Sequence, residues 1–288
     1  MLHGVPRESA RGLAARLSQA VIDQGALPSL VGVVRGKPVV GMSDAQLDEM
    51  LADAGVPKVN TANLGVAMFR RGNAATTVST TMELAAMAGV SVFATGGIGG
   101  VHRAGKGEGG RGKEAPGGAF DVSADLAAFT RFPVAVVTSG VKSILDIAAT
   151  REVLETLGVT VVGYQTDVFP AFYLREPDVA GVGNVDARFD DTRELGEFVR
   201  FEMARTRRGI VVCNPISPEF ELKVEDWRGW LAEAEARVAT AGAGGRDATP
   251  ALLGALHEIS GGATLKANVE LVVSNARVAG QIARAMVR

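Results

Sequence analysis

The sequence predicts an α/β fold, with one domain of three α/β/α layers around a central mixed, largely parallel sheet. Short apolar runs at residues 134–137 and 159–163 are typical of strands that are buried on both faces. Such runs alternate with helical patterns, and no internal repeat or interdomain linker separates them. A chain of 288 residues is long enough to bury one substantial core. We therefore expect residues 1–288 to form a single domain.

The first hundred residues carry clear helix and strand signals. Residues 7–24 predict an amphipathic helix, because Leu13, Leu17, Ala20 and Val21 recur on one face. The other elements expected here are strands at 30–34 and 38–41 joined by a turn at 35–37, a helix that starts at a capping box over 43–46, a helix that follows the Thr/Ser run 76–81 and ends at Gly89, and a strand at 90–94.

The composition changes at residues 104–118, which are rich in glycine, carry charges of both signs and include a proline. This composition predicts a surface loop and not a folded module. Alternation of strands and helices resumes at 134. The elements expected after it are a helix that opens after the turn at 139–142, strands at 159–163 and 210–212, and helices at 225–240 and 266–287.

The charge and cysteine content exclude several classes of partner and compartment. A formal net charge of −2 provides no attraction to nucleic acid or to an anionic membrane, so local donors must hold any anionic ligand. The single cysteine, Cys213, excludes an intramolecular disulfide and suits a reducing cytoplasm. Neither a signal peptide nor a continuous apolar span of membrane length is present, so we expect a cytoplasmic protein without a membrane partner.

Lys142 is the most informative residue, because it follows the apolar run 134–137 through a Ser-Gly turn. Such a corner lies at the carboxyl edge of a parallel sheet, where open α/β folds bind ligands. Partial removal of water there lowers the pKa of an amine and makes it a nucleophile towards a sugar or carbonyl carbon. The alternative is an ordinary solvated lysine in the first turn of a helix.

Two further stretches suit the binding of an anion. Residues 95–100 form a glycine-rich turn directly after an expected strand, where backbone N–H groups can approach a phosphate, and His102 follows them. Their spacing matches neither a Walker loop nor a dinucleotide fingerprint. The Thr/Ser run 76–81 can hold a phosphate by its hydroxyls and the following helix N-terminus, or it can be a capping turn.

Asp121 and Asp125 stand four residues apart, with Ser123 between them. If this stretch is helical, both carboxylates lie on one face, where they could bind a hard cation or orient a sugar hydroxyl. The alternative is one helix-capping aspartate and one solvated aspartate. The three histidines, at 3, 102 and 257, are too scattered for a zinc signature.

Taken together, these stretches resemble one family, the pseudouridine-5′-phosphate glycosidases, also called indigoidine synthase A-like proteins. The strings that carry the resemblance extend over nearly the whole chain. They are 56–59 (Val-Pro-Lys-Val), 75–82 (Ala-Thr-Thr-Val-Ser-Thr-Thr-Met), 92–103 (Val-Phe-Ala-Thr-Gly-Gly-Ile-Gly-Gly-Val-His-Arg), 120–126 (Phe-Asp-Val-Ser-Ala-Asp-Leu), 140–146 (Gly-Val-Lys-Ser-Ile-Leu-Asp), 162–166 (Val-Gly-Tyr-Gln-Thr), 214–216 (Asn-Pro-Ile) and 265–268 (Leu-Lys-Ala-Asn).

The resemblance implies reversible cleavage of the C–C glycosidic bond of pseudouridine 5′-phosphate to uracil and ribose 5-phosphate. It also implies a divalent cation, Mn²⁺ in the family, and a homotrimer. At the matching positions, Lys142 is the nucleophile that forms an imine with C1′ of the sugar, and Asp121 binds the metal. The residues implied to contact or surround the substrate are Lys58, Thr77, Val78, His102, Ser123, Ala124, Asp125 and Asn268.

The implied chemistry explains the need for a lysine. A glycosidase that breaks a C–O bond protonates an oxygen leaving group between two carboxylates. Here the leaving atom is carbon, so an iminium on the opened sugar must serve as the electron sink.

Two departures from the family pattern bear on function. Family members usually begin this region with a strand of the type Ala-Leu-Glu-Ser-Thr, and its glutamate is the proton donor. This sequence begins Met1-Leu2-His3-Gly4-Val5 instead. We expect either a truncated start or loss of that acid, with an exposed sheet edge or a gap where the strand would pair. The second departure is the insertion at 104–118, which we expect to alter access to the pocket.

These departures leave two alternatives open. One is a biosynthetic C-glycosynthase, which joins ribose 5-phosphate to an aromatic or heterocyclic natural-product acceptor. The other is a non-catalytic family member that binds a phosphosugar.

Overall fold

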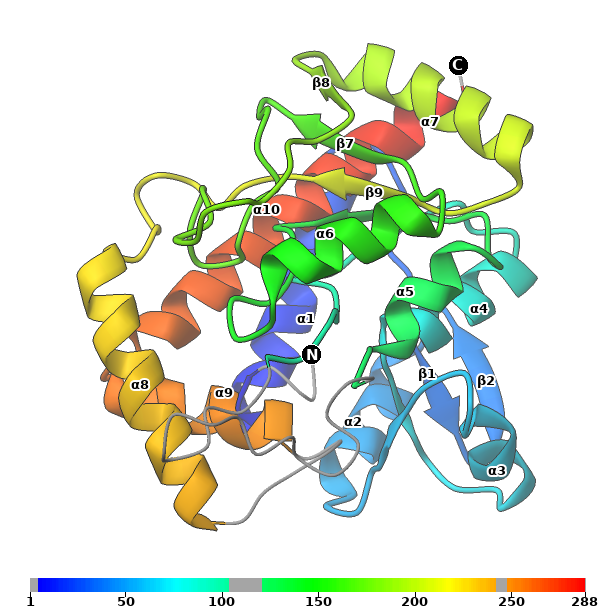
Figure 1. Ribbon diagram of the computed structural model, residues 1–288. Coiled ribbons are helices and arrows are strands. Elements are labelled where there is room, and N and C mark those ends of the chain that lie inside the picture. Colours follow the sequence, from blue (N-terminus) through cyan, green and yellow to red (C-terminus); the bar gives the residue numbers. More distant parts are fainter. Residues whose placement is uncertain (1–4, 104–120, 242–247, 288) are drawn as a thin grey trace.

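The computed structural model of this chain describes residues 5–103, 121–241 and 248–287 (Figure 1). The glycine-rich stretch 104–118 and the first four residues lie outside the described residues. None of the described helices is both long and apolar enough to cross a membrane.

The centre of the fold is a five-stranded sheet in the order β5-β6-β9-β7-β8. Its strands are β5 (Val92–Ala94), β6 (Ala135–Thr138), β7 (Val161–Tyr164), β8 (Ala187–Phe189) and β9 (Ile210–Cys213). Every pairing in it is parallel, so the expectation of a mixed sheet is wrong in this detail. The antiparallel pairing belongs to a separate hairpin, β1 (Val31–Val34) with β2 (Lys37–Val40), whose two-residue turn permits that direction.

Alternate residues of the central strands face opposite sides, and each side is covered by helices (Figure 1). Val136 and Val211 belong to a core cluster with residues of the helices on one face, whereas Val137 and Val212 pack with residues of two helices on the other. Three α/β/α layers follow from this alternation, because a parallel sheet must bury both faces. The fold class predicted from the sequence is confirmed.

In the part of the chain that the structure describes, helices alternate with several of the strands, and three helices follow the last strand, β9. Those that complete the sheet's outer layers are α4 (Val78–Met87), α5 (Ala124–Phe129), α6 (Ile147–Thr156), α7 (Thr192–Thr206), α8 (Val224–Ala241), α9 (Ala248–Ile259) and α10 (Ala263–Met286). The N-terminal part adds α1 (Arg7–Ile22), α2 (Asp44–Ala52), α3 (Leu64–Phe69) and a short parallel pair, β3 (Lys58–Val59) with β4 (Ala75–Thr76). The predicted capping box is present, since the Ser43 hydroxyl accepts from the backbone of Gln46.

The long helix α10 packs against both α1 and α7 and runs beneath the sheet (Figure 1). Strand β5 pairs with β6 on one side and is an edge strand of the described sheet. The residues of β5 are half-buried.

Candidate active site

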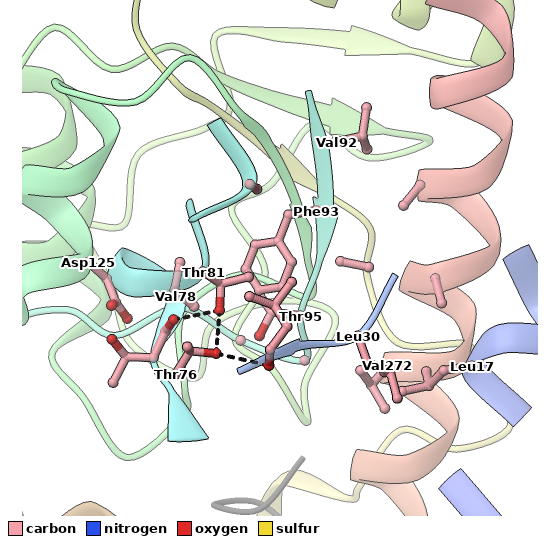
Figure 2. Close-up of a pocket in the computed structure, with 18 of the residues that line it drawn as sticks. Leu17, Leu30, Thr76, Val78, Thr81, Val92, Phe93, Thr95, Asp125 and Val272 are labelled. Atoms are coloured by element: carbon pink, nitrogen blue, oxygen red, sulfur yellow. Dashed lines mark hydrogen bonds between the residues drawn. The ribbon is translucent and has the colours of Figure 1, made fainter. Parts of the chain in front are cut away.

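A cavity of about 910 Å³ opens at the carboxyl ends of β5 and β6 and continues along the side of β5 that faces away from β6 (Figure 2). It brings together the side chains that the sequence selects from distant segments. Those that line it are Lys58, Thr77, Val78, His102, Asp121, Ser123, Ala124, Asp125, Lys142 and Asn268. The list includes every residue predicted to act in the site.

Two loops form the floor of the cavity, one after β5 and one after β6. Their backbones continue to pair beyond the strand ends. Ser139 donates its N–H to the Gly96 carbonyl (2.9 Å), and Ile98 donates to the Gly140 carbonyl (3.0 Å). Lys142 donates in turn to the Ile98 carbonyl (3.2 Å). This pairing holds the lysine backbone against the glycine-rich turn.

Lys142 lies in the connection between β6 and α6, because the helix begins only at Ile147, with Asp146 as its cap. The expectation that a helix opens directly after the Ser-Gly turn is therefore wrong, and so is the alternative of a lysine in a first helical turn. Burial lowers the pKa of Lys142, and the charge of Lys58 lowers it further, while the charge of Asp125 opposes both. The net effect is a Lys142 pKa below the usual value for lysine, so the neutral, nucleophilic amine is easier to form.

Asp125 ties the cavity's polar walls together from the first turn of α5. Its Oδ1 accepts the N–H of Ser79 at the start of α4, and its Oδ2 accepts the N–H of Gly99 (2.9 Å each). The residue is buried, so both bonds are shielded from water. Asp125 therefore fixes α4 and the glycine-rich turn relative to one another.

The two aspartates do not share a helical face and neither of them caps α5, so the predictions of a shared face and of a capping aspartate are both wrong. Helix α5 starts at Ala124, and its cap is Ser123, whose hydroxyl accepts the N–H of Asp125 (3.2 Å). Serine is well suited to this place, because its hydroxyl pairs an otherwise unsatisfied N–H of the first turn. Asp121 therefore lies before the helix and reaches the cavity separately.

The Thr/Ser run is both a helix start and a wall of the cavity. Thr77 precedes α4 in an extended conformation, without a side-chain cap bond. Thr81 Oγ1 lies 2.9 Å from Thr76 Oγ1 and 2.8 Å from the Thr77 carbonyl (Figure 2). These three threonines line the cavity, whereas Thr80 donates its hydroxyl to the Val59 carbonyl outside it (3.0 Å).

His102 and Asp121 form a partly exposed polar part of the site. Nδ1 of His102 lies 3.8 Å from Oδ2 of Asp121, and the Asp121 side chain is 53% exposed. Among the described residues, no group of three or more His, Cys, Asp or Glu side chains is arranged to hold a metal ion. One carboxylate fits only a hard cation that takes most of its oxygens from water or substrate.

Asn275, which is absent from the predicted site, holds the two loops that form the floor of the cavity. Asn275 of α10 is fully buried, and its Nδ2 donates to the Thr95 carbonyl (2.7 Å) and to Ser139 Oγ (3.1 Å). Its Oδ1 accepts from Asn214 Nδ2 (2.9 Å). One side chain thus joins the ends of β5, β6 and β9. A helical asparagine by itself carries no signal of this role.

The second missed group is apolar. Leu17 of α1, Leu30 and Val272 of α10 gather on the side of the cavity away from Asp125, across β5 (Figure 2). Phe172, also absent from the predicted site, lines the lysine end. The cavity therefore has a polar limb around Lys142 and an apolar limb along the open edge of the sheet.

Comparisons with known proteins show the family to which this chain belongs. The family described as "Indigoidine synthase A like protein" matches residues 1–285. The chain is 40% identical over 285 residues to a pseudouridine-5′-phosphate glycosidase of Symbiobacterium thermophilum, covering 99% of this chain and 89% of that protein. It is 39% identical to the protein of the same name from Kosmotoga olearia, with 99% and 93% coverage.

Two solved structures share the fold. One is the prealnumycin C-glycosynthase AlnA in complex with ribulose 5-phosphate, with a TM-score of 0.84, 35% identity and coverage of 99% of this chain and 89% of that one. The other is an indigoidine synthase A-like protein from Thermotoga maritima, with a TM-score of 0.86, 34% identity and coverage of 99% and 90%.

Proposed function

The chain belongs to the indigoidine synthase A-like family, and we propose on that basis that it is a C-glycosidase. Its reaction is the reversible cleavage of pseudouridine 5′-phosphate to uracil and ribose 5-phosphate. The observation that supports this reaction most directly is Lys142, a lysine with a lowered pKa inside the cavity that all the predicted site residues line.

Lys142 supplies the nucleophile. Its neutral amine attacks C1′, forming a C–N bond, while the ring oxygen leaves C1′ and the sugar opens. After a proton is added to the base carbon, the C1′–C5 bond breaks. Its electron pair returns to the pyrimidine ring, and the nitrogen lone pair forms the iminium. Water then hydrolyses the imine, which releases ribose 5-phosphate and restores the amine.

The polar limb suits the phosphorylated sugar. Lys58 brings a positive charge, and Thr77, Ser123 and Asn268 bring groups able to bond hydroxyl and phosphate oxygens. Asp121 is the carboxylate that would hold the divalent cation, Mn²⁺ or another. When bound, such a cation offsets the phosphate charge and organises the pocket.

The decisive experiment traps the imine. Incubation with ribose 5-phosphate and borohydride should attach one pentose phosphate to Lys142, detected by peptide mass spectrometry. Lys142→Ala and Lys142→Arg should both lose the adduct and lower kcat by roughly three orders of magnitude or more. Arginine keeps the positive charge but stays protonated, so it controls for electrostatic loss. An unchanged kcat in either variant would exclude this mechanism.

An enzyme must protonate the base carbon, whereas a protein that only binds a phosphosugar need not, so this step distinguishes the two alternatives. The described residues that line the cavity include two aspartates but no glutamate. A small acid such as formate should raise turnover if the proton donor is missing and the imine still forms. Ribose 5-phosphate binding with no turnover, with or without formate, would favour the binding protein.

A second candidate, C-glycosynthesis, has one observation in its favour. The cavity continues in an apolar limb along β5, which suits an aromatic acceptor, and the AlnA structure has the same fold. A C-glycosynthase should couple ribose 5-phosphate to an aromatic acceptor faster than to uracil. Competition between the two acceptors, followed by chromatography, decides between them.

Assembly and location remain predictions. We propose a homotrimer in the cytoplasm, without nucleic acid or membrane partners. Light scattering should give three times the chain mass of 29.8 kDa. A monomer at micromolar concentration would contradict the trimer.

A further inference from the structure

The segment that contains Phe172 packs directly on the turn that contains Lys142. Phe172 donates its N–H to the Ser139 carbonyl (2.8 Å). Ser143, the residue after the lysine, donates its hydroxyl to the Ala171 carbonyl (2.6 Å) and accepts the N–H of Tyr173 (3.3 Å). These three hydrogen bonds hold Phe172 in one place relative to Lys142.

The backbone of Phe172 is strained. Its φ of 61° lies in the left-handed region, which bulky side chains rarely adopt. Glycine would adopt this conformation without the steric cost, so the backbone conformation does not account for a phenylalanine here. Strain of this kind persists where the surroundings impose it, and it concentrates at functional sites.

The ring lies on the glycine-rich turn beside the stem of the lysine. A methyl group added at Gly97 would lie 2.6 Å from Cδ2 of Phe172 and 3.3 Å from Cγ of Lys142. The Phe172 ring and the Lys142 stem therefore both pack against Gly97. Any side chain at this position would clash with the ring. Phe172 is 2% exposed, although it lines the cavity.

Other rings support Phe172 from behind. Its centroid is 4.5 Å from that of Tyr173, which lies 5.4 Å from Trp227 of α8. Phe172 thus separates the cavity from the core and cannot easily swing away.

We propose that Phe172 is a positioning residue, whose ring packs on the stem of Lys142 and keeps water away from it. This inference rests on the proposed function only for the identity of the substrate. The charged groups that act on the amine are Lys58 and Asp125, and His102 and Asp121 line the same cavity. Burial is the largest cause of the lowered Lys142 pKa, so loss of the ring should act on that cause and not on the charges.

The test measures Lys142 reactivity against pH without relying on substrate. Formaldehyde and cyanoborohydride alkylate neutral amines, and mass spectrometry quantifies the modified Lys142 peptide, with exposed Lys37 as the internal reference. In Phe172→Ala, the pH of half-maximal modification should rise by about one unit or more, because water reaches the amine. An unchanged midpoint in a folded variant overturns the inference.

Two further variants make the result decisive. Phe172→Gly removes the same ring and suits the left-handed backbone, so it should fold even where alanine does not, and its midpoint should rise equally. Phe169→Leu changes a fully buried phenylalanine of the same segment that does not line the cavity. It should lower the melting temperature and leave the midpoint unchanged, and a midpoint that moves equally in this control also overturns the inference.

Trapping with ribose 5-phosphate and borohydride is then repeated on the same variants. A shifted formaldehyde midpoint without any pentose adduct on the wild type keeps the role of Phe172 and rejects the proposed function. A pentose adduct whose pH dependence is unchanged in Phe172→Ala, together with an unchanged formaldehyde midpoint, rejects the role of Phe172 alone.

Discussion

Opposing influences on Lys142 show how single residues set the chemistry of this cavity. Burial and Lys58 favour the neutral amine, whereas Asp125 favours the charged one. Asp125 also accepts the N–H groups of Ser79 and Gly99. The same carboxylate therefore fixes two walls of the cavity and raises the pKa of Lys142. Its two effects can be separated by a change that keeps the shape and removes the charge.

Asp125→Asn should move the Lys142 modification midpoint to lower pH, opposite to the effect of Phe172→Ala, because the charge that raises the pKa is lost. It should also lower the free energy of unfolding by about 1–3 kcal/mol, since an amide nitrogen would then face a backbone N–H. The reductive alkylation assay and urea unfolding measure the two effects. Asp121→Asn is the matched control and should leave the midpoint in place; a rise with Asp125→Asn would contradict this account.

At the scale of elements, helix α10 holds the ends of three central strands in place through hydrogen bonds. Its Asn275 bonds residues at the ends of β5, β6 and β9. Its Asn268 lines the cavity, as does the apolar Val272 one helical turn later. Buried polar networks of this kind specify one arrangement, because each partner left unpaired is costly. The position of the two loops therefore depends on the register of a distant helix.

Asn275→Leu should destabilise the protein by about 2–3 kcal/mol, because the Thr95 carbonyl and the Asn214 amide lose their partner in the core. Ser274→Ala removes one neighbouring bond, from Asn214 Nδ2 to Ser274 Oγ (3.1 Å), and should cost well under half as much. Urea unfolding of both variants measures the difference. Equal losses would show that the network is not centred on Asn275.

At the scale of the whole molecule, the cavity lies between the N-terminal elements and the layered sheet. Lys58 comes from β3, Asp125 from α5 and Asn268 from α10, so only the complete fold assembles the polar limb. A ligand that bridges these segments should stabilise the whole cooperative unit, because it binds the folded state alone.

Ribose 5-phosphate at a hundred times its Kd should add about 2.7 kcal/mol to the free energy of unfolding and raise Tm by roughly 4–5 °C. Ribose without the phosphate, at the same concentration, should give a much smaller shift, since it lacks the charge that Lys58 faces. Differential scanning calorimetry measures both. Equal shifts for the two sugars would place the phosphate outside the polar limb.

Local sequence patterns determined much of the fold. The apolar run ending at Val137 predicts a buried parallel strand, and the Ser43–Gln46 spacing predicts a helix start; both are present. These signals depend on periodicity and on bonds within a few residues, which the sequence contains directly. The candidate site was selected through long family strings, and the cavity brings its members together.

Only the tertiary structure decided how those residues act. The spacing of Asp121 and Asp125 suggested a shared helical face, but Ser123 caps the helix and separates them. Phe172 has a left-handed backbone conformation, which phenylalanine rarely adopts. Asn275 bonds Thr95, which lies 180 positions earlier in the sequence. Contacts between distant segments depend on how whole elements pack, and packing leaves no mark on the local pattern of a chain.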